Sequence, residues 1–211
     1  MSRENGFINK LSQSLKGDLP GQESQYRMAP ELRLENSHDM YRNAAVMILL
    51  YQKDEKWHLV LMRRPEYEGV HSNQVSLPGG IREDIDEGLG ETALRETREE
   101  LGIDDSSIQL LGKLSKLEIP VSGIEVTPFI GAHHDIPKFN PDATEVAYLI
   151  EVPLADLISP ANIRQEHRTI LCKLVKVPYY QIGKEQVWGA TAMILSEFLD
   201  IVRSLKEVDL Q

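Results

Sequence analysis

Cysteine is almost absent from this chain of 211 residues, in which Cys172 is the single example. One cysteine excludes an intrachain disulfide, which fits a reducing compartment. The sequence also lacks any apolar run near the roughly 20 residues that a membrane-spanning helix needs. Residues 1–6 do not show the basic-then-apolar pattern of a signal peptide. We therefore expect a cytoplasmic protein without membrane association.

Basic residues are in deficit as well, with 23 lysines and arginines against 33 aspartates and glutamates and a net charge of −10. Because nucleic-acid binding depends on basic patches that neutralise phosphates, nucleic acid is not an expected partner. A small phosphorylated substrate is compatible with this charge if cations are present at the site. The sequence shows no internal repeat or long linker, and its length predicts one domain with a full core.

The most informative stretch runs from Gly79 to Ile103. It reads as a glycine-containing loop followed by a helix that Gly102 ends, since the residue just past a helix often has a left-handed backbone. At 3.6 residues per turn, one stripe of this helix is mostly apolar and suited to packing. That stripe consists of Gly90, Leu94, Thr97 and Leu101.

Three glutamates crowd together on the other side of this helix, because Glu96, Glu99 and Glu100 stand at positions i, i+3 and i+4. Like charges at this spacing destabilise a helix by roughly 0.2–0.5 kcal/mol per pair. The helix dipole disfavours an anion in the last turn by about 0.3–1 kcal/mol more. Two interpretations follow. The glutamates form either a solvated acidic face or a site for a divalent cation such as Mg²⁺, which prefers oxygen ligands.

Residues Arg95–Ile103 resemble the second half of the Nudix box, G-x5-E-x7-R-E-U-x-E-E-x-G-U, where U is aliphatic. Thr97 departs from this pattern at an aliphatic position. The first half is one residue longer than the pattern, so either Asp86 or Glu87 fills the first acidic position. The resemblance implies a Nudix hydrolase, which cleaves diphosphate linkages of nucleotide-like substrates with the help of divalent metal ions.

A second segment narrows the resemblance. Leu61–Arg64, followed by residues 71–80, is similar to the segment that marks the coenzyme A pyrophosphatase branch, His-x-Gly-Gln-x-x-Phe-Pro-Gly-Gly, which here begins at His71. Asn73 and Leu77 replace the glycine and the phenylalanine. This branch implies hydrolysis of coenzyme A or its derivatives to phosphopantetheine and adenosine 3′,5′-bisphosphate. The alternatives are a Nudix hydrolase for ADP-ribose, NADH or a dinucleoside polyphosphate, and a non-catalytic Nudix-fold ligand sensor.

The resemblance also assigns roles to individual residues. Glu96, Glu99 and Glu100 are expected to hold Mg²⁺ or Mn²⁺, with Glu145 joining when substrate is bound. Glu99 or Glu145 is expected to act as the general base. Arg95, also a catalytic residue in this prediction, would orient Glu99 across one helical turn.

Four further residues are candidates for binding the substrate. Gly79 and Gly80 would let the backbone come close to metal or phosphate. Arg63 and Arg64 either hold phosphate, for which the arginine fork is suited, or form a surface pair beside the acidic loop. The expected partner is therefore a small nucleoside diphosphate.

The resemblance implies a Nudix-type α/β/α sandwich with a mixed central sheet, whereas the patterns alone imply only an α/β domain. Residues 1–42 are expected to form a helix, ended by Gly17, and an irregular arm from residue 22. This arm would pack on the domain or on a neighbouring subunit of a homodimer, and residues 43–211 would form the hydrolase domain. Apolar patterns predict strands at 43–51, 57–62, 108–119, 124–132, 144–152 and 170–177, and helices at 153–158 and 187–205. Cys172 is expected to pack within its strand.

Overall fold

The computed structural model describes residues 3–32, 40–66, 68, 73–170 and 172–205. The helices are α1 (Arg3–Ser14), α2 (Gly21–Tyr26), α3 (Leu89–Leu101), α4 (Leu154–Ile158) and α5 (Gly189–Ser204), with short 3₁₀ turns at Asp105–Ser107 and Pro160–Asn162. The strands are β1 (Arg42–Lys53), β2 (Lys56–Arg63), β3 (Val75–Ser76), β4 (Gly79–Ile81), β5 (Ile108–Lys113), β6 (Leu117–Ile119), β7 (Ile124–His133), β8 (Tyr148–Pro153), β9 (Ile163–Ile170), β10 (Lys173–Ile182) and β11 (Glu185–Trp188).

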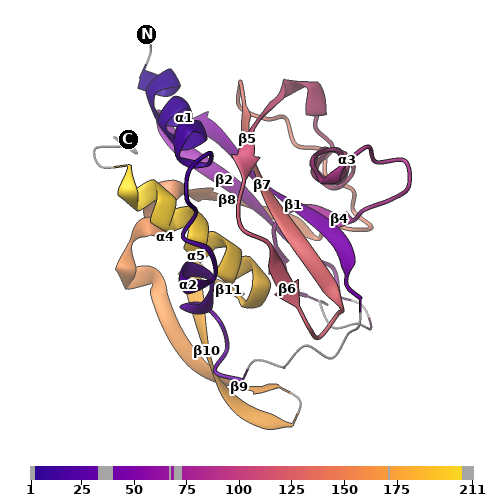
Figure 1. Cartoon of the computed structure of the whole chain (residues 1–211), viewed down its shortest axis with the longest axis vertical. Helices are drawn as coiled ribbons and strands as arrows, with labels where there is room; N and C mark the ends of the chain where they lie inside the picture. Colours follow the sequence, from indigo (N-terminus) through magenta and orange to yellow (C-terminus); the bar gives the residue numbers. More distant parts are fainter. Residues whose placement is uncertain (1–2, 33–39, 67, 69–72, 171, 206–211) are drawn as a thin grey trace.

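A mixed sheet forms the middle layer of the molecule. Within the described residues it has eight strands in the order β3-β2-β1-β7-β5, with β4 paired to β1, β6 to β7 and β8 to β2. β1 and β7 run parallel, and the other pairs are antiparallel. Figure 1 shows α3 on one face of this sheet and α5 on the other. The predicted α/β sandwich with a mixed central sheet is confirmed.

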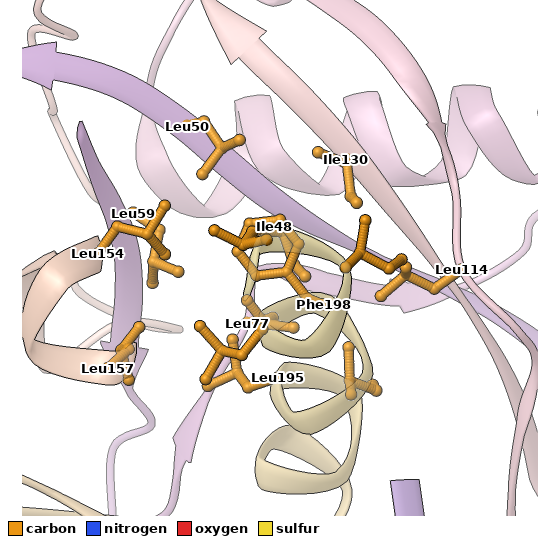
Figure 2. Close-up of a cluster of buried hydrophobic side chains, with 14 of the residues drawn as sticks. Ile48, Leu50, Leu59, Leu77, Leu114, Ile130, Leu154, Leu157, Leu195 and Phe198 are labelled. Atoms are coloured by element: carbon orange, nitrogen blue, oxygen red, sulfur yellow. The ribbon is translucent and has the colours of Figure 1, made fainter. Parts of the chain in front are cut away.

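The central part of strand β1, residues 44–50, is apolar because both of its faces are covered. Ile48 and Leu50 join the core on the α5 side, whereas Met47 and Leu49 join a second core beneath α3. This alternation follows from the two-residue period of a strand. Figure 2 shows the α5-side core, in which Phe198 packs among the side chains of the sheet.

The N-terminal segment packs against the α5 side of the sheet. Phe7 of α1 lies 5.0 Å from Trp57 of β2, measured between ring centroids. The irregular arm predicted from residue 22 is wrong in part, because residues 21–26 form α2. A buried amide anchors this helix to α5, since Gln25 donates to Glu197 Oε2 at 2.8 Å.

The C-terminal third differs most from the sequence-based expectations. Residues 163–188 form a second sheet, in which β10 pairs with β9 and β11. Cys172 is exposed in the β9–β10 turn with φ of 61°, so its predicted packing within a strand is wrong.

The strand predicted at 108–119 is divided into β5 and β6. Among the described helices, none is long and apolar enough to cross a membrane.

Candidate active site

Helix α3 carries the acidic residues, and its last residue is the one that the sequence predicts. Gly102 follows Leu101 with φ of 63°, the left-handed conformation, and its amide donates to the Arg98 carbonyl at 2.9 Å. A Cβ atom at Gly102 would lie 1.9 Å from the carbonyl oxygen of Asn140. Glycine is therefore required both for the backbone angle and for the close approach of the next loop.

That loop brings Glu145 to the acidic helix. The amide of Asn140 donates to the Leu101 carbonyl at 2.9 Å, and the amide of Asp142 donates to the Glu100 carbonyl at 3.2 Å. Glu145 is exposed in the turn that follows, three residues before β8 begins. The strand predicted from residue 144 therefore starts later, and the turn leaves Glu145 free to face the helix.

A buried ion pair fixes Arg95 beneath the glutamates. Its Nε donates to Asp86 Oδ1 at 2.9 Å and its terminal nitrogen donates to Oδ2 at 3.0 Å. Asp86 also accepts from the Thr92 hydroxyl and the Glu83 amide, each at 2.9 Å. These hydrogen bonds, Arg95 foremost, hold the pKa of Asp86 far below its usual range. Glu87 is exposed, so the structure places Asp86, not Glu87, against Arg95.

The other guanidinium nitrogen of Arg95 points at the acidic cluster. It donates to Glu96 Oε1 at 2.8 Å and to Glu99 Oε2 at 3.1 Å. Arg95 therefore connects the buried Asp86 to two of the predicted metal ligands. The sequence predicted the contact with Glu99 but not the one with Asp86, which was only a candidate, with Glu87, for the first acidic position of the motif.

The three glutamates of α3 differ strongly in burial. Glu99 is about half exposed, Glu96 is mostly covered, and Glu100 is only 2% exposed. Burial raises the pKa of Glu100 to about 8, although Arg64 and the Gly79 amide favour its charged form. Burial also raises the pKa of Glu96, and the nearby charges of Glu99 and Glu145 add to that rise. Glu96 is thus close enough to the other three carboxylates to be repelled by them.

The glycine pair packs directly against these carboxylates. The Gly79 amide donates to Glu100 Oε2 at 2.7 Å. A Cβ atom at Gly79, where φ is 150°, would lie 2.3 Å from the Ala45 carbonyl oxygen. A Cβ atom at Gly80 would lie 2.4 Å from Glu96 Oε1. Both positions therefore admit only glycine unless strand β1 or the glutamates move.

The two candidate phosphate-binding arginines point in different directions, as neighbours on a strand end do. A terminal nitrogen of Arg64 lies 3.6 Å from Glu100 Oε1 and donates to the Gly79 carbonyl at 3.4 Å. Arg63 instead bonds Glu185 Oε2 at 2.6 Å and the Asn73 carbonyl at 2.6 Å. Only Arg64 is brought to the acidic cluster. His71, which begins the predicted motif, lies outside the described residues.

A cavity of about 870 Å³ opens beside the acidic cluster. Glu96, Glu100 and Glu145 line it together with Gly79, Gly80 and Arg64. The remaining wall is mostly apolar and comes from the N-terminal arm, β1, the β6–β7 hairpin and α5. Examples are Pro30, Val46, Ile119, Val121 and Met193. The sequence did not predict that the arm and α5 would line the cavity.

The donor chemistry of the cluster fits a hard divalent cation. As the side chains stand, no three His, Cys, Asp or Glu residues in the described part of the chain are placed to hold a metal ion. Glu96 and Glu99 instead bond Arg95, and Glu100 bonds the Gly79 amide. Even so, carboxylates that repel one another and resist ionisation gain most from a bound cation, and their oxygens are the ligands that Mg²⁺ prefers.

These observations define a layered α/β domain in which a cluster of carboxylates lines a large cavity. A family model described as the NUDIX domain matches residues 40–174. The chain belongs to the Nudix hydrolase family, whose members are pyrophosphohydrolases that use divalent metal ions. The predicted family and enzyme class are confirmed.

Two relatives illustrate the similarity in sequence. The chain is 35% identical over 181 residues to a protein of Pectobacterium atrosepticum named uncharacterized Nudix hydrolase NudL. The aligned region covers 82% of this chain and 88% of that protein. It is 34% identical over 161 residues to Nudix hydrolase 15, mitochondrial, of Arabidopsis thaliana, over 73% of this chain and 56% of that one.

Solved structures share the fold at low identity. A MutT/nudix family protein from Enterococcus faecalis superposes with a TM-score of 0.54 and 16% identity, over 96% of this chain and 75% of that chain. A MutT protein from Methanosarcina mazei superposes with a TM-score of 0.51 and 19% identity, over 83% of this chain and all of that chain. These similarities support the fold.

Proposed function

We propose that the chain hydrolyses the diphosphate of coenzyme A or its derivatives, giving phosphopantetheine and adenosine 3′,5′-bisphosphate. The observation that carries this proposal is the large cavity that Glu96, Glu100 and Glu145 line together with a mostly apolar wall. A substrate in which a long, weakly polar arm is joined to a diphosphate suits such a cavity. ADP-ribose, NADH and dinucleoside polyphosphates instead carry polar sugars on both sides of the diphosphate.

Glu96, Glu99 and Glu100 would hold Mg²⁺ or Mn²⁺, with Glu145 joining when substrate is bound. The bound ion would supply charge neutralisation at the diphosphate and a lower pKa for its water. Arg95 acts as a positioning residue, because it bonds Glu96 and Glu99 while Asp86 holds it from below.

Glu99 or Glu145 would remove the proton from the attacking water, and both side chains are exposed to solvent. Arg64 offers its guanidinium N–H groups to phosphate oxygens. Gly79 and Gly80 lie so close to β1 and to Glu96 that a Cβ atom would not fit, and they would let the backbone come close to metal or phosphate.

The same proposal includes the organisation and the location of the protein. In this proposal residues 43–211 are the hydrolase domain, and residues 1–42 are an N-terminal helix and arm that pack on it, with Ala29 and Pro30 in the cavity wall. The protein works in the cytoplasm.

The experiment is a turnover assay with Mg²⁺ over coenzyme A, ADP-ribose, NADH and a diadenosine polyphosphate. We expect coenzyme A to give the highest kcat/KM. Glu99→Gln and Glu145→Gln are compared with Glu91→Gln, which changes an exposed glutamate of the same helix. The variant of the general base should lose about 100-fold or more in kcat, and Glu91→Gln should match the unmodified protein.

Two results would contradict the proposal in different ways. A higher kcat/KM for ADP-ribose, NADH or the dinucleotide would reassign the substrate within the family. Tight nucleotide binding without metal-dependent cleavage of any of the four compounds would indicate a ligand sensor.

A further inference from the structure

A second, smaller cavity of about 350 Å³ lies next to the large one. Gln74 and Trp188 line both cavities, so the two cavities are direct neighbours. The described residues that line the smaller cavity include three cations, Arg63, Arg168 and Lys184, and no carboxylate. Three cations facing one hollow are unexpected on a chain with a net charge of −10.

The cavity is formed where the second sheet meets the central one. Arg63 ends β2, Arg168 belongs to β9, and Lys184 lies in the turn between β10 and β11. Arg63 and Arg168 are more than 100 positions apart in the chain, and the packing of the two sheets brings them together. The sequence pattern therefore gave no indication of this cluster.

The two arginines are fixed before any ligand arrives. Arg63 donates to the Tyr148 hydroxyl at 3.2 Å, to the Asn73 carbonyl at 2.6 Å and to Glu185 at 2.6 Å. Arg168 donates to Glu166 at 2.6 Å and to the Gln186 side chain, and its guanidinium lies 4.4 Å above the centre of the Trp188 ring. Such preorganisation lowers the entropic cost of binding an anion.

Lys184 differs from the arginines in having no counter-ion. Its ammonium nitrogen lies 5.2 Å from the centre of the Tyr148 ring, and within the described residues it forms no ion pair. Each arginine is balanced by one carboxylate, Glu185 or Glu166, so Lys184 leaves the cluster with a net positive charge. An anionic group entering the cavity would meet this ammonium together with guanidinium N–H groups.

We propose that this cavity binds a phosphomonoester carried by the nucleotide part of the substrate, separate from the diphosphate that is cleaved. The inference rests on the proposed function, in which the substrate is coenzyme A with a phosphate on its adenosine ribose. Arg63, Arg168 and Lys184 form the phosphomonoester site. Because Arg64 faces the acidic cluster and Arg63 faces this site, the end of β2 separates the two anionic groups of one substrate.

The first test measures binding rather than turnover. Adenosine 3′,5′-bisphosphate and AMP, neither of which contains a diphosphate, are titrated calorimetrically into the full chain with Mg²⁺ present. We expect the bisphosphate to bind about tenfold or more tightly than AMP, as a charge-assisted hydrogen-bonded contact implies, and the difference to shrink with added salt. Lys184→Ala should reduce this ratio several-fold, and Arg168→Ala/Lys184→Ala should bring it to about one.

Lys173→Ala is the matched control, because it removes an exposed lysine of β10 that does not line the cavity. Its affinity ratio should equal that of the unmodified protein. Equal affinities for the two nucleotides, or a ratio that survives in the double variant, would overturn the proposal. Inorganic phosphate binding at this site while the bisphosphate binds no better than AMP would assign the cavity to a free anion and would also overturn it.

A second test separates this inference from the proposed function. Turnover of coenzyme A is compared with that of dephospho-coenzyme A, and the KM of coenzyme A should be about tenfold lower. If neither is cleaved but the nucleotide ratio holds, the proposed function fails and the phosphomonoester site stands. If both are cleaved with the same KM, the phosphomonoester site fails and the proposed function stands.

Discussion

Asp86→Asn removes the negative charge beneath Arg95 while keeping the shape of the side chain. Asp86 accepts hydrogen bonds from Arg95, Thr92 and the Glu83 amide, and its residue is only 5% exposed. Breaking a buried ion pair by neutralising one partner costs about 3–5 kcal/mol. Because the amide oxygen can still accept one hydrogen bond, we expect the lower end, about 3 kcal/mol, or about 6–12 °C in melting temperature for a chain of this size.

This loss should depend on pH in a defined direction. The folded state depresses the pKa of Asp86, so its contribution is fully present above the unfolded pKa, about 3.9. It is lost as the pH falls below that value toward the folded pKa. Chemical denaturation at pH 7 and at pH 3 should therefore show a smaller difference between Asp86→Asn and the unmodified protein at pH 3.

Activity and a neighbouring variant complete this experiment. Without Asp86, Arg95 no longer holds Glu96 and Glu99 as firmly, and turnover should fall about 10–100-fold, as for other residues that orient metal ligands. The exposed Glu87→Gln should change stability by less than about 0.5 kcal/mol and leave turnover unchanged. If Glu87→Gln is as damaging as Asp86→Asn, the assignment of Asp86 as the partner of Arg95 is wrong.

Three further variants test the packing around the site. Gly79→Ala forces a Cβ atom to within 2.3 Å of the Ala45 carbonyl oxygen, so it should lower stability by about 1–3 kcal/mol and abolish turnover. The control is Gly6→Ala, whose Cβ atom would have no neighbour within 4 Å and which should change neither stability nor turnover. Phe198→Ala empties a fully buried position in the core of Figure 2 and should cost about 3–5 kcal/mol in chemical denaturation; a cost below about 1 kcal/mol would contradict that packing. Glu100→Gln should be more stable than the unmodified metal-free protein at pH 8.5 but not at pH 5. The folded pKa of Glu100 is about 8, so the folded state holds this proton more tightly than the unfolded state and loses stability as the pH rises from about 4 to about 8. Equal stabilities at pH 8.5 would show that Glu100 ionises without penalty.

The sequence predicts the parts of the site that depend on local spacing. The acidic helix, its end at Gly102 and the contact between Arg95 and Glu99 all follow from helical geometry, and each appears in the structure. The strands predicted at 43–51 and 57–62 are also confirmed as β1 and β2, and Asp54 and Glu55 have positive φ in the turn that joins them. These features involve residues close together in the chain.

Features that depend on distant contacts could not be predicted. The burial of Glu100 arises because β4 and Arg64 pack over it, and helical periodicity placed it on the acidic side without showing how strongly it is covered. The arginines at 63 and 64 were treated as one pair, but the sheet directs them to two cavities. Predicting either outcome requires the topology of the sheet, which local patterns do not contain.

The proposal depends on the α3 glutamates binding a divalent cation. Mn²⁺ is titrated into the full chain and followed by electron paramagnetic resonance, with Glu96→Gln as the variant and Glu91→Gln as the control on the same helix. We expect saturable Mn²⁺ binding that is weakened about tenfold or more by Glu96→Gln, is unchanged by Glu91→Gln, and accompanies the appearance of coenzyme A cleavage. Absence of binding, or equal binding by the Glu96→Gln variant, would contradict a metal site on this helix.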